Sequence, residues 1–573
     1  MPPPPPAPPH RELTARAVAV AILVAALMGA TYPAIVLRIG YGPNISVVSA
    51  FLGYLILGLV GLATGSRGTR HEVNLVQTAG TSAGQAAFMA VVVYAIDLLD
   101  QKGLLHLHLS PLQIFAWLSV AGLLGVLLAV PLRRHFIEEE DLPFADGTAA
   151  GETLLVLDEG AREAAPRLAA LGAGALASAA IAALRDLAGA LPEAIALPGL
   201  RAAAALRIGL EVGLLSVGAG MLIGLRVTLS MALGMVLAWF VAPGPLLAHG
   251  LVGELSFNAI VRGWTMWPAT GLMVSGGLTA LVLQRRAVAR SFRGLTRGGG
   301  EERGDFPLRW VVAGVAVLAP LLAVIQRVSL GFPLWLTAAS LLLSAVLMLV
   351  GIRVLGETNW APISSMANVM QAVFAVLAPG QMGMNMIGSG MSGTVASCGE
   401  TLMQDYRAGQ IVGSTSRNLT ILQLVGVPVG ALAVAVTYPA LVARYGIGDR
   451  LPSPISQRWA GFAELLGRGL STLPASAVVA LGIAIALGAA LTVAERSPRL
   501  GRLLPSPTAV GLGMLIPAWT VVPMVIGAAA QRLWGRLGPR SEARLAMPLA
   551  SGLITGEALV VLWSALRAAF PGG

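Results

Sequence analysis

A segment from Met382 to Gly409 combines apolar residues with polar groups that a simple membrane anchor does not need. It contains six glycines and five serine or threonine residues, one acid, Glu400, inside the apolar stretch, and a charged cluster, Asp405–Arg407, at its end. Glycine loosens a helix or lets another backbone approach closely. An acid inside a membrane segment is costly and usually faces a cavity or pathway. We therefore expect this segment to line a transport pathway; the alternative is a tightly packed helix of small residues without a ligand.

Glu400 is the first side chain from which we expect chemistry. A carboxyl that lines a dry cavity can load and release a proton, or can pair with an amine of a substrate. The alternative is a structural acid held at the N-terminus of a broken helix. Glu152 and Glu557 stand at corresponding positions in similar segments and share both interpretations. Asp405 is a further candidate for proton coupling, although a gate or an ion pair at the end of a helix would explain it equally well.

Four segments share a pattern of small residues, then Gly followed by Glu or Gln, then apolar residues. They are Gly80–Gln85, Gly147–Leu154, Gly393–Leu402 and Gly556–Leu559. Repeated, interrupted hydrophobic segments are typical of secondary transporters, whose sites lie near the interface between repeats. Gln85 cannot carry a proton, so the repeats are not equivalent.

Further polar residues inside apolar segments are candidates for the substrate path. Arg226 could face a substrate carboxylate or an acid. The complete set of path candidates is Arg226, Asn359, Asn385, Ser392, Thr394 and Gln85. Methionines between Met382 and Met391 could bind a soft metal, but such residues more often serve as adaptable packing. We predict no metal site and no cofactor.

The composition places these residues in a membrane protein. Of 573 residues, 56% are hydrophobic and 12% are charged, against about 25% charged residues in soluble domains. The net charge of +10 is explained by arginines in cytoplasmic loops that face anionic lipid, and no nucleic-acid module is evident. One lysine against 37 arginines suggests a bacterial genome rich in G and C. The single cysteine excludes an internal disulfide.

Apolar segments of about 20 residues predict an all-α polytopic fold with about 14 to 16 transmembrane helices, including broken or re-entrant segments built from internal repeats. Candidate spans include 208–225, 265–283, 384–403 and 508–530. The last contains two prolines, and a re-entrant hairpin there would return the arginines at 532–544 to the cytoplasmic side.

Arginine placement suggests the domain organisation and orientation. We predict a disordered cytoplasmic tail at 1–12, an N-terminal membrane half at 13–284, a basic cytoplasmic loop at 285–306 and a C-terminal membrane half at 307–570. The expected location is the bacterial cytoplasmic (inner) membrane, with the N-terminus in the cytoplasm. The oligomeric state stays open, with a homodimer as one option.

Several of these motifs resemble the oligopeptide transporter (OPT) superfamily, which includes the yellow stripe-like metal–chelate carriers. The similar stretches are Leu142–Glu152, Gly220–Ser230, Gly356–Pro362, Gly393–Ala396 and Met403–Gly409. The last is similar to a Met-x-Asp-x-Lys-x-Gly run of the family, with Arg407 in place of Lys. The resemblance implies proton-driven uptake of peptides or metal chelates through a bundle of helices. The Asn-Pro-Phe signature of eukaryotic peptide carriers is not evident, so the substrate cannot be carried over.

A membrane-embedded enzyme and a passive channel fit the sequence less well. Gly390–Gly393 fits the G-x-S-G signature of intramembrane serine proteases, but these need a histidine base, usually later in the chain, and no histidine follows His249. The sequence also lacks H-E-x-x-H and P-loop motifs. A passive channel would not need so many non-equivalent broken segments and buried acids. We predict a proton-coupled importer of oligopeptides or peptide-like metal chelates; the alternatives are a metal–siderophore or chelate carrier without peptide transport and, less favoured, an intramembrane hydrolase.

Overall fold

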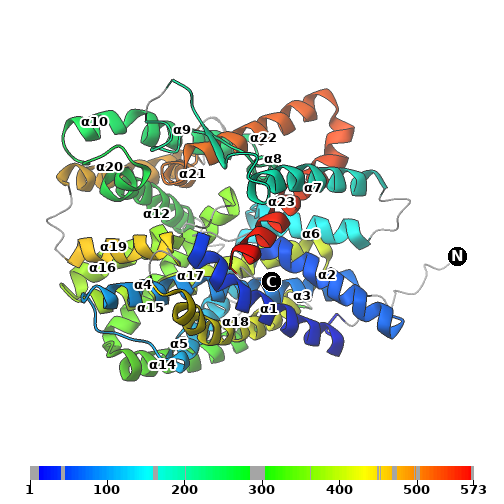
Figure 1. Cartoon of the computed structure of the whole chain (residues 1–573), viewed down its shortest axis with the longest axis horizontal. Coiled ribbons are helices and arrows are strands. Elements are labelled where there is room, and N and C mark those ends of the chain that lie inside the picture. Colours follow the sequence, from blue (N-terminus) through cyan, green and yellow to red (C-terminus); the bar gives the residue numbers. More distant parts are fainter. Residues whose placement is uncertain are drawn as a thin grey trace.

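The computed structural model is almost entirely helical (Figure 1). It describes residues 12–39, 45–66, 68–158, 165–199, 202–283, 304–359, 361, 363–447, 451, 453–467, 474–495, 497 and 504–569. The predicted tail at 1–12 and the basic loop at 285–306 fall almost entirely outside the described residues.

Eleven helical segments within the described residues are long and apolar enough to cross a membrane. They are formed by α1 (Ala15–Ile39), α2 (Ile45–Thr64), α3 (Arg70–Phe88) with α4 (Ala90–Gln101), α5 (Pro111–Ala129) with η1 (Val130–Leu132), α7 (Ala165–Asp186), α9 (Leu225–Val236) with η3 (Leu237–Val241) and α10 (Pro243–Ala248), α14 (Leu308–Leu330), α15 (Leu334–Thr358), α18 (Ser416–Tyr445), α20 (Ala475–Ala494) and α23 (Pro539–Ala569). The predicted polytopic all-α class is confirmed.

Other helices are shorter, broken or more polar. They are η2 (Arg134–Glu139), α6 (Ala145–Asp158), α8 (Leu215–Ile223), α11 (Phe257–Ile260), η4 (Val261–Thr265), α12 (Met266–Leu283), α16 (Ile363–Leu377), α17 (Met382–Val412), α19 (Pro454–Gly467), α21 (Pro507–Gly513) and α22 (Ala518–Leu537). Interrupted helices at membrane depth are tolerated where protein covers their free backbone groups.

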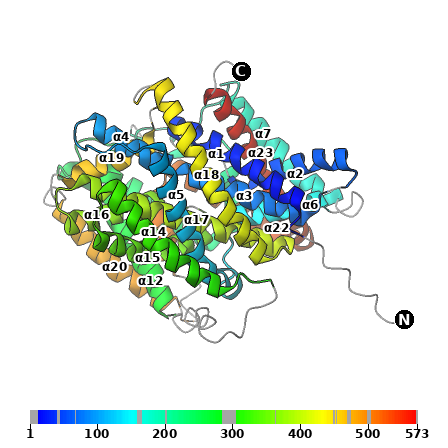
Figure 2. The same cartoon turned by 90° about the horizontal axis from the view of Figure 1, so that it is seen from below.

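The long helix α17 contains the segment that the sequence singled out. It lies in the middle of the molecule in both views (Figures 1 and 2) and packs against α15, α5, α6, α16 and α3. Its 31 residues are nearly all buried, yet it is not among the eleven apolar spans. A helix surrounded by other helices does not need an apolar surface, because it touches no lipid.

The segments α21 and α22 form a hairpin whose two ends meet. Leu504 and Pro505, before α21, line the same cavity as Gln531 and Arg532, near the end of α22. The two ends of the α21–α22 segment therefore lie at one cavity. Pro517 stands between the two helices as the residue that precedes α22. The re-entrant hairpin at 508–530, which would return the arginines at 532–544 to the cytoplasmic side, stays a prediction. The hairpin packs against α9 and α8 (Figure 1).

The predicted span at 208–225 is wrong. Its first residues form β2 (Gly209–Glu211), which pairs antiparallel with β1 (Ala194–Ala196). Only the nine residues of α8 follow, and they end at Gly224, whose φ of +89° lies in a region that favours glycine. Apolar composition alone does not distinguish this hairpin and half-helix from a full span.

Peripheral helices show the face expected toward lipid. On α14, Val317 and Val328 are exposed, and on α20, Val479 and Ile483 are exposed. Both helices lie at the edge of the molecule (Figure 1). Exposed apolar side chains of this kind are stable in contact with acyl chains.

Candidate functional site

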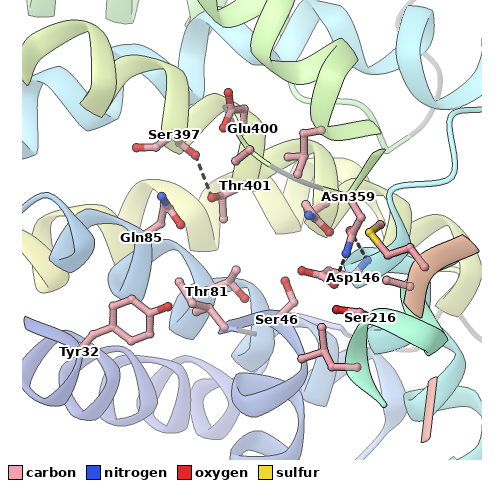
Figure 3. A pocket seen from close by; sticks show the side chains of 17 residues that line it. Tyr32, Ser46, Thr81, Gln85, Asp146, Ser216, Asn359, Ser397, Glu400 and Thr401 are labelled. Carbon is pink, nitrogen blue, oxygen red and sulfur yellow. Dashed lines mark hydrogen bonds between the residues drawn. The ribbon is translucent and has the colours of Figure 1, made fainter. Parts of the chain in front are cut away.

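A cavity of about 270 Å³ lies where the helices of the centre converge. Its walls come from α1, α2, α3, α6, α8, α15, α17 and α22 and from the residues after α15. The polar side chains that line it are Tyr32, Ser46, Thr81, Gln85, Asp146, Ser216, Asn359, Ser397, Glu400, Thr401 and Gln404. All of these residues are drawn in Figure 3, and all but Gln404 are labelled; Glu400 lies on one wall and Asp146 with Asn359 on another.

The helix α17 contributes a polar stripe to this cavity. Ser397, Glu400, Thr401 and Gln404 are spaced at i, i+3, i+4 and i+7, so one face of the helix presents all four. The Thr401 hydroxyl is satisfied within the helix, because it donates to the Ser397 carbonyl at 2.8 Å. The stripe explains why the sequence places polar groups at this spacing among small residues.

Glu400 is the least satisfied polar group of the cavity wall. Its side chain is buried, with a residue exposure of 2%, and neither carboxylate oxygen has a hydrogen-bond partner among the described residues. Gly351 of α15 lies directly beside Oε1. A buried carboxyl without a partner is expensive as an anion. The position therefore suits a group that gains its partner from a proton or a cargo molecule.

Asp146 and Asn359 form a reciprocal pair across the cavity wall. The Asn359 Nδ2 donates to Asp146 Oδ1 at 2.6 Å, and the Asp146 backbone N–H donates to Asn359 Oδ1 at 2.8 Å. Asn359 is the residue after α15 and has a left-handed φ of +58°. At the next position, the Gly147 N–H donates to Gln404 Oε1 at 2.6 Å. These contacts attach the beginning of α6 to α15 and α17.

Three of the predicted site residues, Glu400, Gln85 and Asn359, line this cavity together. Asp146 was missed, although it lies inside the Leu142–Glu152 motif, where it is the acid in the first turn of α6; an acid directly before the small residues of that motif was a signal that could have found it. Tyr32 and Ser46 were also missed, because single polar residues in apolar helices carry little pattern.

Other predicted path residues on α17 lie apart from the cavity lining. Asn385 Nδ2 donates to the Gln371 carbonyl at 2.6 Å, and the Thr394 hydroxyl donates to the Gly390 carbonyl at 2.8 Å. Ser392 is fully buried, and its Oγ has no partner among the described residues. These residues are nearer the start of α17 than the cavity is.

The repeat-related acids Glu152 and Glu557 are held by arginines of one helix, α7. Arg167 lies 3.4 Å from Glu152, and Arg185 lies 2.8 Å from Glu557. Glu557 also accepts from the backbone N–H groups of Leu214 and Leu215, at 2.7 and 2.8 Å. Glu557 therefore acts as a structural acid that binds the N-terminus of α8. The four related segments thus place chemically different groups around the centre.

Asp405 is completely buried and is bound by two amides. The Gln77 Nε2 donates to its Oδ1 at 2.5 Å, and the Gln423 Nε2 donates to its Oδ2. The ion pair at this helix end is made instead by Arg407, with Asp141 at 2.7 Å. Asp405 therefore connects α3, α17 and α18.

Arg226 is not among the residues that line the central cavity. Its Nη2 lies 2.7 Å from Glu495 Oε1, and its side chain is half exposed. It lines a second cavity, together with Arg532. The sequence pattern at Gly220–Ser230 gave no information about this partner, which is 269 positions away.

The central cavity is acidic. Asp146 and Glu400 line it, and within the described lining there is no Lys, Arg or His. In the part of the chain that the structure describes, no group of three or more His, Cys, Asp or Glu side chains could hold a metal ion.

Comparison with known proteins identifies the family of this fold. A model of the OPT oligopeptide transporter protein family matches residues 12–568. The chain belongs to the OPT oligopeptide transporter family. It is therefore a multi-pass membrane transporter, and because members of this family are carriers that catalyse no reaction, the intramembrane hydrolase alternative is excluded.

Relatives in this OPT family cover most of the chain at low identity. The probable metal-nicotianamine transporter YSL10 of Oryza sativa subsp. japonica is 25% identical over 630 aligned residues, which cover 96% of this chain and 90% of the relative. A protein of Haemophilus influenzae, provisionally named an oligopeptide transporter, is 24% identical, and the alignment covers 85% of this chain and 86% of the relative. The metal-nicotianamine transporter YSL3 of Arabidopsis thaliana is 23% identical, with 61% of this chain and 57% of the relative covered.

Proposed function

We propose that this transporter imports oligopeptides or peptide-like metal chelates across the bacterial cytoplasmic membrane, driven by protons. In this proposal the N-terminus is cytoplasmic, the central cavity holds the cargo, and Glu400 carries the coupling proton. The observation that carries the proposal is Glu400, a residue of the cavity lining whose buried carboxyl has no hydrogen-bond partner among the described residues.

Exchange between a proton and a cargo group at one carboxyl would couple their movements. A buried, unpaired carboxyl is most stable when protonated. Binding of a cationic group beside it favours release of the proton, since the opposite charge stabilises the carboxylate. The carboxyl would then be neutralised in two states only, when it is protonated and when it is paired with the cargo. In these two states the change of conformation would cost little free energy, as transport by alternating access requires.

The acidic lining of the cavity favours a cargo that carries a cationic group. Asp146 and Glu400 line the cavity, and among the described lining residues no basic side chain is available for a free carboxylate. A cargo that presents an amine or a coordinated metal cation would therefore be bound better than an anion. The relatives named above carry cargo names of both kinds, metal-nicotianamine and oligopeptide, and both classes remain in the proposal.

The test is uptake into proteoliposomes with an inward proton gradient, offering a pool of short peptides and, separately, iron or nickel chelates. Accumulation against a concentration gradient should occur for one class and should stop when the proton gradient is collapsed. Glu400→Gln should abolish accumulation but keep exchange of cargo across the membrane without a gradient. Glu254→Gln, in an exposed loop that borders neither cavity, is the matched control and should behave as the unmodified protein does.

Each other outcome of the uptake experiment leads to a different conclusion. Full accumulation in Glu400→Gln would reject Glu400 and move the coupling site to Glu152, Glu557 or Asp405. Uptake of chelates alone would establish a chelate carrier without peptide transport. Equilibration without accumulation would contradict proton coupling, and no uptake of either class would reject the cargo assignment.

A further inference from the structure

A second cavity, of about 670 Å³, lies at the two ends of the α21–α22 hairpin. Its lining residues are Gly224, Leu225, Arg226, Leu229, Ser230, Leu233, Leu504, Pro505, Gln531 and Arg532. The described lining therefore holds two arginines and no acid. Arg226 stands at the first turn of the apolar span Leu225–Ala248, so this cavity opens at the level where a membrane-spanning segment meets the aqueous phase.

The basic character of this place extends beyond the cavity. Arg532 has no ion-pair partner among the described residues, and Arg536, Arg540 and Arg544 follow at intervals of four, all exposed. Arg226 pairs with Glu495, but burial, together with the nearby Glu357 carboxylate, raises the pKa of Glu495 to about 7. The charge of Glu495 is thus incomplete at neutral pH, and Arg226 keeps the capacity to bind another anion.

An apolar strip leads from the arginines along the outside of α9. Leu229, Leu233 and Leu237 follow one another at intervals of four residues, so they lie on one face of the helix. Their exposed fractions are 51%, 43% and 41%. On α22, Leu533 and Leu537, which follow Arg532 in the chain, are also exposed. The ligand that fits this surface has an anionic head and a long apolar tail.

We propose that an anionic phospholipid binds here, with its phosphate between Arg226 and Arg532 and an acyl chain along Leu229, Leu233 and Leu237. Guanidinium groups match phosphate oxygens with paired N–H donors. Basic pockets between membrane helices bind anionic head groups in this way. The lipid bridges the broken helix at Gly224 and both ends of the α21–α22 hairpin, so it stabilises these interrupted elements. This inference does not depend on the cargo or on the coupling ion.

The experiment uses the purified full chain in a non-ionic detergent. Thermal unfolding is measured with added phosphatidylglycerol, with phosphatidylcholine of the same acyl chains, and with soluble glycerol 3-phosphate; native mass spectrometry counts the bound lipids. Phosphatidylglycerol should raise the Tm more than phosphatidylcholine does, and glycerol 3-phosphate should have no effect at the same concentration. Arg226→Gln and Arg532→Gln should each weaken phosphatidylglycerol binding about fivefold, and the double variant about twenty-five-fold.

The matched control is Arg309→Gln, an exposed arginine at the start of α14, which should bind as the unmodified protein does. If loss of the Arg226–Glu495 pair unfolds the double variant, Arg532→Gln alone decides, because Arg532 makes no ion pair within the described structure. Equal stabilisation of the variants and the unmodified protein by phosphatidylglycerol would overturn the proposal. An equal response to phosphatidylcholine, or an equal response to glycerol 3-phosphate, would overturn it as well.

Discussion

Gly351 of α15 and Glu400 of α17 face each other where the two helices pack, and the Glu400 carboxyl occupies the space that a side chain at position 351 would need. A Cβ built on Gly351 would collide with Glu400 Oε1. The position of the only unpartnered carboxyl in the described cavity lining thus depends on a residue of another helix.

Gly351→Ala tests this dependence. The added methyl group should push the Glu400 carboxyl out of its position, because the helix backbone behind it cannot yield easily. We expect proton-driven accumulation to fall at least roughly tenfold, the effect of about 1.4 kcal/mol at the coupling step. Uptake into proteoliposomes and the Tm in detergent are the measurements.

Two further variants serve as controls for Gly351→Ala. Gly482→Ala, on the exposed part of α20 where a Cβ meets no atom within 4 Å, should leave both accumulation and Tm unchanged. The pair Gly351→Ala with Glu400→Ala should recover any Tm lost in the single glycine variant, since the collision is gone. Normal accumulation in Gly351→Ala would show that the position of Glu400 is not critical.

The sequence predicted the membrane helices and the polar helix α17, because both depend on local pattern. A bilayer requires continuous apolar segments, and a buried pathway requires polar residues at helical spacing. The pairing of Asp146 with Asn359, and of Arg226 with Glu495, joins residues 213 and 269 positions apart. Such partners depend on how the helices pack, about which one sequence holds no local signal. The same limit explains why β1 and β2, only three residues each, were missed.

Substitutions of Asn359 should distinguish two contributions to stability, its left-handed backbone conformation and its hydrogen bonds with Asp146. Asn359→Gly keeps the left-handed backbone but loses both contacts with Asp146, and Asn359→Ala loses the contacts and adds strain of about 1 kcal/mol. Asn359→Asp places two carboxylates together. We therefore expect the Tm and the cargo affinity to fall least for glycine, more for alanine and most for aspartate. Equal Tm values for the glycine and alanine variants would contradict a strained position.

Asp405 should prove structural. The Gln423 Oε1 has no partner among the described residues, so its amide can turn over and accept from an amide at position 405. Asp405→Asn should therefore keep proton-driven accumulation and most of the Tm. Asp405→Ala leaves two buried amide donors unsatisfied and should lose about 2–5 kcal/mol of unfolding free energy. Loss of accumulation in a normally stable Asp405→Asn would instead assign the coupling proton to Asp405.

Glu140 makes the free energy of unfolding depend on pH in the acid range. Burial alone would raise the pKa of this carboxyl, but the contact with His135, whose Nε2 lies 3.1 Å from Glu140 Oε1, and the charge of Arg353 outweigh burial and lower the pKa from 4.5 to about 2. Arg353 Nη1 lies 2.6 Å from Glu140 Oε2. Because the folded pKa lies below the unfolded one, the stabilisation is complete above about pH 4.5 and is lost as the pH falls toward about 2.

Glu140→Gln should remove this contribution, on the order of 3 kcal/mol at neutral pH. Thermal unfolding of the variant and the unmodified protein, measured between pH 7 and pH 2, should show a constant difference above pH 5 that shrinks on acidification. Glu138→Gln breaks the more exposed pair with Arg133 and should cost less than about 1 kcal/mol. A difference between Glu140→Gln and the unmodified protein that persists unchanged at pH 2 would show that packing of the side chain, and not its charge, stabilises the contact of η2 with α15.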